Sequence, residues 1–262
     1  MTPSSKNSKK LILNLLLATD QGTLTTAEAV KAGQLLGVAG GNVRVTLTRL
    51  AAAGLLESSG RAEYRLSAGG KVLGEAVAVW RTAEDRLRPW NGGWIAVLTG
   101  NLPKAARTPW RARYRALALV GLKELDRDLY LRPDNFAGGV VEARERLMSL
   151  GLGIEMPVFL AQELDPARDR RARSLWDARS LVRRYRNWRR RLEAWLSRYE
   201  TKPTEIAARE AFVLGDAAIH ELVFDPMLPE PLVDTAERRA FTEVLITYDR
   251  VGKEIWRRFL GR

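Results

Sequence analysis

Five side chains between residues 42 and 49 have the chemistry and spacing to read the edges of base pairs. They are Asn42, Arg44, Val45, Thr48 and Arg49. Val43, Leu47 and Leu50 recur at i, i+4 and i+7, so we expect them to share one buried helix face. The other five residues then lie on the sides or the opposite face, where amide, hydroxyl and guanidinium groups can bond to bases and phosphates. The pattern predicts a helix over residues 42–53 that enters the major groove of double-stranded DNA.

The flanking segments are suited to position such a helix. A short helix is expected over residues 25–36, because Thr25 or Thr26 can cap it and Glu28 sits near the capping-box position. The glycine-containing break at residues 37–41 follows it. Residues 55–66 resemble a hairpin whose tip carries Arg61, within reach of phosphate or the minor groove. Two helices around a tight turn, followed by a hairpin, predict a winged helix-turn-helix.

The overall charge fits a polyanionic partner. The 262-residue chain carries a formal net charge of +12. Residues 1–90 hold 12 Lys and Arg against 7 Asp and Glu, and residues 166–262 hold 21 against 15. A basic surface gains affinity for DNA by releasing counterions from phosphates. Residues 91–165, with 10 against 9, are the least suited to lie on DNA.

Composition argues against most catalytic chemistry. There is no cysteine and only one histidine, so disulfides, zinc fingers, Cys nucleophiles and Cys/His metal clusters are excluded. A Ser-His-Asp triad would need His220, and there is no Gly-x-Ser-x-Gly elbow. The glycine-rich stretches match neither a P-loop nor a dinucleotide fingerprint. We therefore expect no enzyme, no cofactor and no metal site.

The N-terminal apolar run is interpreted as a buried helix. Lys9 and Lys10 precede the apolar residues 11–18, which resembles a short signal peptide. The run is brief, contains Asn14 and lacks a small-residue cleavage site. No stretch is long enough to span a membrane. A cytoplasmic protein without a membrane partner is expected.

The middle of the chain alternates element types. A connector helix is expected over residues 71–88, ended by the residues from Pro89 to Gly93. Beyond it, strands and helices are expected in the order β-α-β-α-β, at residues 94–98, 109–119, 128–131, 140–150 and 156–161. This order fits a ferredoxin-like unit that lacks one strand or has it near Leu152.

The last third is expected to be helical. Apolar residues step by 4, 3, 4, 3 and 4 through Leu181, Tyr185, Trp188, Leu192, Trp195 and Tyr199. This stripe indicates a long helix within residues 165–200, with its aromatic residues in the core and its arginines on a solvated face. An alternative is a platform for nucleic acid. Further helices are expected over residues 205–222 and 235–260, separated by a rigid loop at residues 225–231.

Several of these segments together resemble the PaaX family, which comprises repressors of phenylacetic acid catabolism genes. The similarity lies in five motifs in the right order, from about residue 10 to the end of the chain. They are residues 43–50 followed by Gly54-Leu55-Leu56, residues 64–70, Trp90-Asn91-Gly92-Gly93-Trp94, Trp176-Asp177 with Leu181, Tyr185 and Trp188, and His220 with residues 225–229. Asn91 stands where the family has Asp, and the chain is short for the family.

The resemblance implies an α+β, mostly helical protein. Residues 1–70 would form the winged helix-turn-helix, 71–90 the connector, 91–164 a ferredoxin-like domain similar to Cas2, and 165–262 a helical domain for dimerisation, effector response or both. It further implies a homodimer that represses an aromatic-acid catabolic operon from a palindromic operator. Release would follow binding of phenylacetyl-CoA or another acyl-CoA.

Composition alone makes Trp176, Arg183 and Arg184 candidate effector residues, because a CoA thioester needs cations for its phosphates and an apolar pocket for its acyl group; His220 is a further candidate. A simpler interpretation of His220 is a helix-end residue bonded to a carbonyl or to Asp225. Two other functions stay open. A Cas2-like nuclease would need a metal ligand at the end of its first strand, where this chain has Thr99-Gly100-Asn101. A protein-interaction module would reuse the winged fold without DNA.

Overall fold

A computed structural model describes residues 5–18, 22–71, 79–100, 107–152 and 156–262. The chain divides into two compact units, each made of separate segments. The first comprises Met1–Trp80, Leu192–Ala217 and Val244–Arg262, and the second comprises Arg81–Arg191 and Ala218–Glu243. The long C-terminal helices therefore contribute residues to both units. The domain boundaries expected from the sequence remain a prediction.

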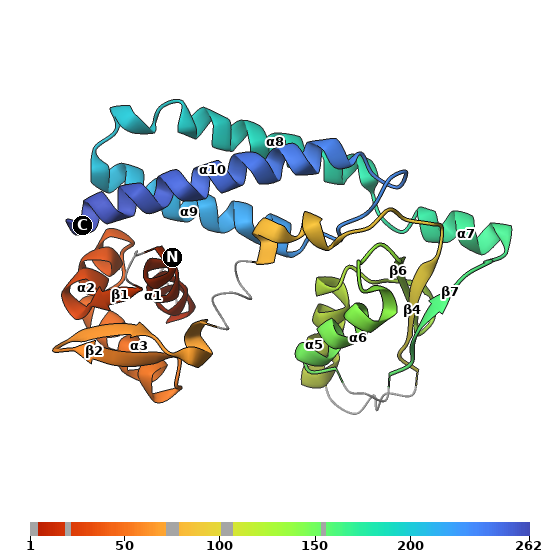
Figure 1. Cartoon of the computed structure of the whole chain (residues 1–262), viewed down its shortest axis with the longest axis horizontal. Helices are drawn as coiled ribbons and strands as arrows, with labels where there is room; N and C mark the ends of the chain where they lie inside the picture. The colour runs from red at the N-terminus through yellow and green to blue at the C-terminus, as the bar shows by residue number, and fades with distance from the viewer. Residues whose placement is uncertain (1–4, 19–21, 72–78, 101–106, 153–155) are drawn as a thin grey trace. The chain divides into compact units, whose positions relative to one another are not determined.

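The N-terminal module, residues 5–66, combines helices with a small antiparallel sheet (Figure 1). Within the described residues its strands are ordered β1-β3-β2, with Leu24 opposite Tyr64 and Leu56 opposite Leu66. The side chains that fill its interior come mainly from one face of each helix, including Leu11, Ile12 and Leu47. The elements in chain order are α1 (Ser5–Ala18), β1 (Thr23–Thr25), α2 (Thr26–Leu35), α3 (Gly40–Ala52), β2 (Leu56–Gly60) and β3 (Glu63–Leu66).

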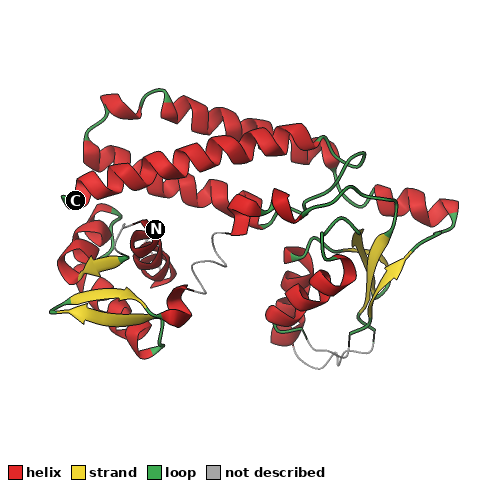
Figure 2. Ribbon diagram, viewed as in Figure 1, coloured by secondary structure: helices red, strands yellow, loops and turns green. Residues whose placement is uncertain are grey.

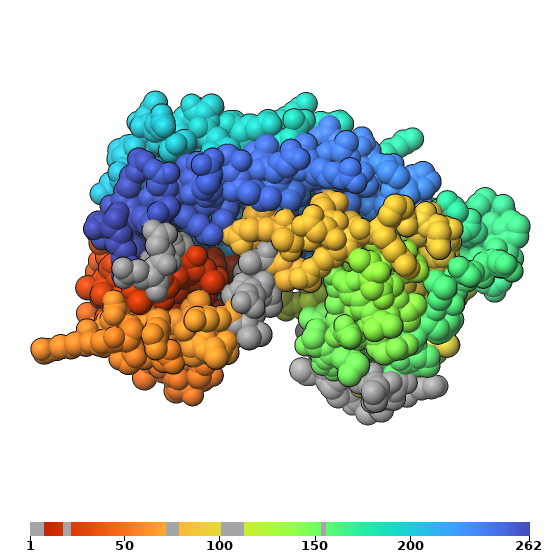
Figure 3. Space-filling view, in the orientation of Figure 1, coloured from red at the N-terminus to blue at the C-terminus, as the bar shows by residue number. Residues whose placement is uncertain are grey.

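Local sequence signals set the boundaries of this module. Thr25 caps α2 by accepting from the Glu28 N–H, and the Glu28 carboxylate accepts from the Thr25 N–H, which confirms the predicted capping box. The break between the helices is shorter than predicted, because α3 begins at Gly40. The hairpin of β2 and β3 agrees with the strands expected over residues 55–66. It projects beyond the neighbouring helices, in orange in Figure 3.

The second sheet is antiparallel and has the strand order β5-β6-β4-β7 (Figure 2). Helices α5 and α6 cover one of its faces, where Leu117 and Leu147 join Ile95 and Val97 in the core. The fourth strand, expected to be absent or to lie near Leu152, is β5. The elements are β4 (Trp94–Leu98), α5 (Arg107–Leu119), β5 (Lys123–Asp126), β6 (Leu129–Pro133), α6 (Gly139–Ser149) and β7 (Val158–Ala161).

The helix expected over residues 71–88 is wrong at residues 79–88. Residues 72–78 lie outside the described residues, and Val79–Thr82 and Glu84–Arg86 form 3-10 turns, η1 and η2. Trp80 is buried. A 3-10 turn repeats every three residues, so the spacing from Trp80 to Ala83 fits this conformation as well as an α-helix. Leu87 then bridges to Phe136, and the Arg88 N–H donates to the Asn135 carbonyl. This segment is thereby fastened to the second sheet.

Long helices make up most of the C-terminal part. The single helix expected within residues 165–200 is interrupted, because α7 (Pro166–Arg173) ends before α8 (Ala178–Leu196) begins. The predicted stripe is buried at Leu181, Tyr185, Leu192 and Trp195, whereas Tyr199 belongs to the 3-10 turn η3 (Tyr199–Thr201). The helices expected over residues 205–222 and 235–260 are α9 (Thr204–Val223) and α10 (Thr235–Leu260). Across the described residues, no helix is both long and apolar enough to cross a membrane.

Candidate nucleic-acid interface

Helix α3 has a buried face and an exposed face that match the predicted division. Val43, Leu47 and Leu50 are buried. All five candidate base-reading residues are exposed, and Val45 retains 48% of its accessible surface. A β-branched apolar residue that stays this exposed beside polar neighbours suits contact with a thymine methyl group. The exposed residues are Asn42, Arg44, Val45, Thr48 and Arg49.

The arginines near this face are available for an anionic partner. Within the described residues, Arg44, Arg49 and Arg61 form no ion pair with a carboxylate. Arg61 is exposed in the turn of the β2–β3 hairpin, next to Ala62, which has a positive φ of 57°. By contrast, Arg65 on the same hairpin pairs with Glu57 at 2.7 Å. Unpaired guanidinium groups are suited to bind phosphate or guanine.

The two helices of the module approach closely because a glycine lies between them. A Cβ atom on Gly33 would meet the Val43 Cγ2 atom at 2.5 Å, below normal contact. The chain then reverses at Gly37, whose φ of +75° favours glycine. The spacing of α2 and α3, and so the presentation of the exposed face, depends on these two residues.

The hydroxyl groups of α3 are partly used inside the helix. Thr46 Oγ1 donates to the Asn42 carbonyl at 2.7 Å, and Thr48 Oγ1 donates to the Arg44 carbonyl at 3.2 Å. Thr48 therefore offers mainly an acceptor and a methyl group to a ligand. In the described part of the chain, no hydrogen bond holds the Asn42 side-chain amide.

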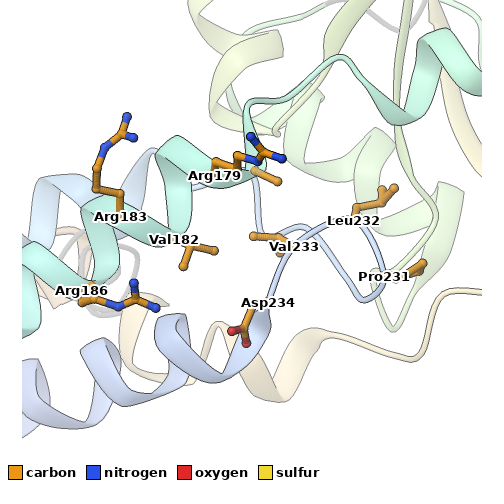
Figure 4. A pocket seen from close by; sticks show the side chains of 9 residues that line it. Arg179, Val182, Arg183, Arg186, Pro231, Leu232, Val233 and Asp234 are labelled. Carbon is orange, nitrogen blue, oxygen red and sulfur yellow. The ribbon is translucent and has the colours of Figure 1, made fainter.

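The predicted effector residues do not form a single site. Trp176 and Arg184 line the same cavity of about 540 Å³ in the second unit. Arg183 lines a different groove, of about 570 Å³, between α8 and residues 231–234 (Figure 4). In Figure 4, Val182 and Val233 face each other across this groove, while Arg183 points away from it. His220 lines neither; it is exposed and its ring lies 4.4 Å from that of Phe224.

Aromatic and cationic groups surround the cavity that contains Trp176. Tyr114, Tyr130 and Phe224 contribute rings, and Lys123 contributes a second cation. Lys123 Nζ donates to the Leu175 carbonyl at 2.9 Å, and Arg184 pairs with Glu221 at 2.7 Å. Burial raises the pKa of Tyr130 to about 12. Sequence inspection missed Lys123 and Tyr130 because they belong to β5 and β6, far from α8 along the chain.

Trp176 joins two of the motifs that carry the family resemblance. It stacks on Trp94, with ring centroids 6.4 Å apart and planes within 1°, and Trp94 meets Trp90 edge-on at 5.0 Å. The Asn91 side-chain oxygen accepts from the Gly93 N–H at 3.0 Å. An amide oxygen therefore makes the turn contact that an Asp carboxylate would make at this position.

The loop at residues 225–231 is fixed by buried polar groups. The Tyr185 hydroxyl donates to the Asp225 carboxylate at 2.5 Å, and the Met227 N–H donates to it at 2.7 Å. Burial raises the pKa of Asp225, while the positive charge of Arg238 and these hydrogen bonds oppose the rise. Arg238 also pairs with Glu84 and donates to the Leu228 carbonyl at 2.7 Å. His220 is therefore not the partner of Asp225.

A second buried arginine supports the same loop. Arg132 is fully buried; it donates to the Val120 carbonyl and, at 2.7 Å, to the Asn135 side chain. Burial lowers the pKa of Arg132 to about 9. The Asn135 amide donates in turn to the Met227 carbonyl at 2.8 Å. Pro226 of this loop lines the Trp176 cavity, so the network sets one wall of it.

The described end of β4 has few side chains that could bind a metal ion. Thr99 lies 3.4 Å from the Asp128 carboxylate, measured between Oγ1 and Oδ1, and Asn101 is outside the described residues. Among residues that the structure describes, no group of three or more His, Cys, Asp or Glu side chains is arranged to hold a metal ion.

Comparison with known proteins supports the family resemblance. Residues 176–258 match the family described as PaaX-like protein C-terminal domain. We refer to the matched range, residues 176–258, as the PaaX-like domain. The PaaX-like domain contains the motifs at Trp176–Trp188 and at His220–Pro229, whereas the three earlier motifs lie outside the matched range.

A solved structure shares the fold over nearly the whole chain. It is the uncharacterized protein Rv0674 from Mycobacterium tuberculosis, which is 22% identical with a TM-score of 0.62. The match covers 94% of this chain and 98% of the solved chain, so the similarity in fold extends beyond the PaaX-like domain. No curated protein sequence matches the chain.

Proposed function

We propose that the chain is a DNA-binding transcriptional regulator whose N-terminal module is a winged helix-turn-helix. The observation that carries the proposal is the exposed face of α3, with Arg44 and Arg49 unpaired, beside a hairpin with Arg61 at its tip. In this assignment α3 enters the major groove and the hairpin follows the backbone beside it. The +12 net charge favours the encounter with DNA.

Selection of binding sites from random duplexes with the full-length protein tests this proposal. Arg49→Ala should cost about 1–3 kcal/mol on the selected site if the side chain reads a guanine. If Arg49 contacts phosphate instead, all sequences should be weakened alike. Arg61→Ala should lower affinity and reduce the salt dependence by roughly one phosphate contact.

A matched control uses Arg170, an exposed arginine of α7 outside the N-terminal module. Arg170→Ala removes the same charge, so a specific interface predicts a smaller effect than either test variant. If no sequence is enriched, or if all three variants bind alike, the DNA-reading assignment fails and an interaction module becomes the better interpretation.

The resemblance to PaaX repressors supports a more specific role. In this role the protein is a homodimer that represses an aromatic-acid catabolic operon from a palindromic operator, and an aryl-CoA or other acyl-CoA releases it. The second sheet, with the element order β-α-β-β-α-β and the strand order β5-β6-β4-β7, would be the ferredoxin-like, Cas2-like domain. Light scattering of the full chain measures the dimer.

The effector is assigned to the Trp176 cavity, because its rings suit an aryl or acyl group and Lys123 and Arg184 suit phosphate. Calorimetry with a panel of acyl-CoA thioesters, phenylacetyl-CoA among them, tests the class of ligand. Arg184→Gln should weaken binding, whereas Arg183→Gln, which alters the neighbouring residue but not this cavity, should not. The reverse result would refute the assignment of the effector to the Trp176 cavity. If no thioester binds, this effector class is wrong.

A further inference from the structure

The start of α2 is fastened to the end of α10 by directed polar contacts within the first unit. Arg262 Nε donates to Glu28 Oε1 at 2.6 Å, and Arg262 Nη2 donates to Glu28 Oε2 at 2.8 Å. One turn along α2, Lys31 Nζ donates to the Phe259 carbonyl at 2.5 Å and lies 4.5 Å from the Phe259 ring centroid. We call these two contacts the α2–α10 clamp. A further ion pair joins Lys10 of α1 to Asp216 of α9.

Glu28 serves the clamp and the helix cap with one carboxylate. It accepts from the Thr25 N–H at 2.7 Å and from the Thr25 hydroxyl at 2.9 Å, in addition to Arg262. The side chains of Glu28 and Arg262 are only 17% and 26% exposed, so the pair is partly shielded from salt. A bidentate Arg–carboxylate pair also fixes direction, which a lysine would not.

Each side of the clamp is rigidly supported. On α10, Phe259 packs edge-on against Trp256 at 5.5 Å, and Trp256 packs against Phe212 of α9 at 6.2 Å. On the other side, α2 packs directly on α3 at Gly33 and Val43. The clamp therefore connects a packed aromatic cluster to the helix that supports α3.

We propose that Glu28, Lys31 and Arg262 are positioning residues for DNA recognition. This inference rests on the proposed function. By holding α2 on α10, the clamp fixes the exposed face of α3 relative to the first unit's C-terminal helices. In a dimer, the clamp would hold the two recognition helices at one separation. Binding to an operator with two half-sites would then cost less orientational freedom than it would without the clamp. A single half-site does not depend on that separation.

The test compares three duplexes: the site selected by the wild-type protein, one half-site, and the full site with its spacer changed by about two base pairs. Arg262→Gln should weaken binding to the full site by about fivefold, the value of a partly shielded ion pair. Lys31→Met, which removes a charged hydrogen bond to a carbonyl, should have an effect of about the same size. Affinity for the half-site should stay within about twofold, and discrimination between the correct and the altered spacer should decrease.

Arg258→Gln is the matched control. Arg258 lies in the last turn of α10, four residues before Arg262, and pairs with Glu254 of its own helix. The variant therefore makes the same charge change without touching α2. Glu28→Gln retains an acceptor for the cap, and its effect should not add to that of Arg262→Gln. Thermal unfolding of each variant is measured in parallel to show that the fold is retained.

The outcomes separate the two proposals. If the wild-type protein selects a two-half-site operator but Arg262→Gln behaves like Arg258→Gln on all three duplexes, the clamp has no positioning role. A loss on the half-site as large as that on the full site also overturns it, since it indicates direct DNA contact or local unfolding of α2. If the wild-type protein selects no duplex, the proposed function fails, and the inference fails with it.

Discussion

Gly33→Ala tests whether the approach of α2 and α3 is as close as the structure indicates. The added Cβ would lie 2.5 Å from Val43 Cγ2, which is about 1 Å closer than ordinary contact. Val43 is fully buried and β-branched, so its side chain cannot rotate away freely. The substitution must therefore push the two helices apart or strain one of them.

The magnitude follows from two opposing effects. Overpacking of a core costs about 1–3 kcal/mol. Replacement of glycine by alanine inside a helix gains about 1 kcal/mol in helix propensity. Gly33→Ala should thus lower the free energy of unfolding by about 0–2 kcal/mol, as the difference between those two ranges. Val43→Ala alone creates a cavity and should cost about 2 kcal/mol.

The decisive measurement is the double variant. Without the Val43 Cγ2 atom the clash disappears, so Gly33→Ala should stabilise the Val43→Ala protein by about 1 kcal/mol. Denaturant or thermal unfolding of the wild type, both single variants and the double variant gives the coupling directly. If Gly33→Ala is equally destabilising in both backgrounds, the two residues do not touch as described and the argument for α3 positioning is refuted.

The remaining predictions concern charge and buried polar groups. Although burial raises the pKa of Glu28, hydrogen bonds from Arg262 and Thr25 hold it below its ordinary value of 4.5. A carboxyl with a lowered folded-state pKa contributes stability that is present above its unfolded pKa and is lost as pH falls through the folded value. The melting temperature of wild type should therefore exceed that of Glu28→Gln at pH 7, and the gap should close as the pH falls below 4.5; a gap that persists in acid contradicts the assignment. Tyr185→Phe should destabilise the protein by about 1–3 kcal/mol, because buried Asp225 loses a donor. Its control, Tyr199→Phe, removes an exposed bond to Glu200 and should change stability by less than about 0.5 kcal/mol; equal effects in unfolding experiments would show that the Tyr185 bond is unimportant.

Local features of this protein could be predicted from the sequence because nearby residues decide them. The capping box of Thr25 and Glu28 is made within one turn, so the residue types and their spacing suffice. The buried face of α3 and the stripe of α8 follow from helical periodicity. Asn42, Arg44 and Arg49 are exposed because they lie off the buried face that this periodicity defines.

Other elements were missed because their signals are weak or nonlocal. The edge strand β5 has the sequence Lys-Glu-Leu-Asp, in which Leu125 is the one buried residue. An edge strand with one face in solvent carries too few apolar residues to be recognised, and its partner β6 supplies the pairing. The spacing of Trp80 and its neighbours fits both an α-helix and 3-10 turns. The folded chain has the 3-10 turns, and they are followed by contacts of Leu87 and Arg88 with residues that border the second sheet.

Whether an arginine forms an ion pair with a distant carboxylate depends on the tertiary structure alone. Sequence composition treats Arg44, Arg184 and Arg262 alike, as basic residues on helical or terminal segments. In the folded chain Arg184 pairs with Glu221 and Arg262 pairs with Glu28, residues 37 and 234 positions away, whereas Arg44 meets no carboxylate in the described part of the chain. Ion pairing depends on distances of a few ångströms between atoms, and only the packing of distant helices sets those distances.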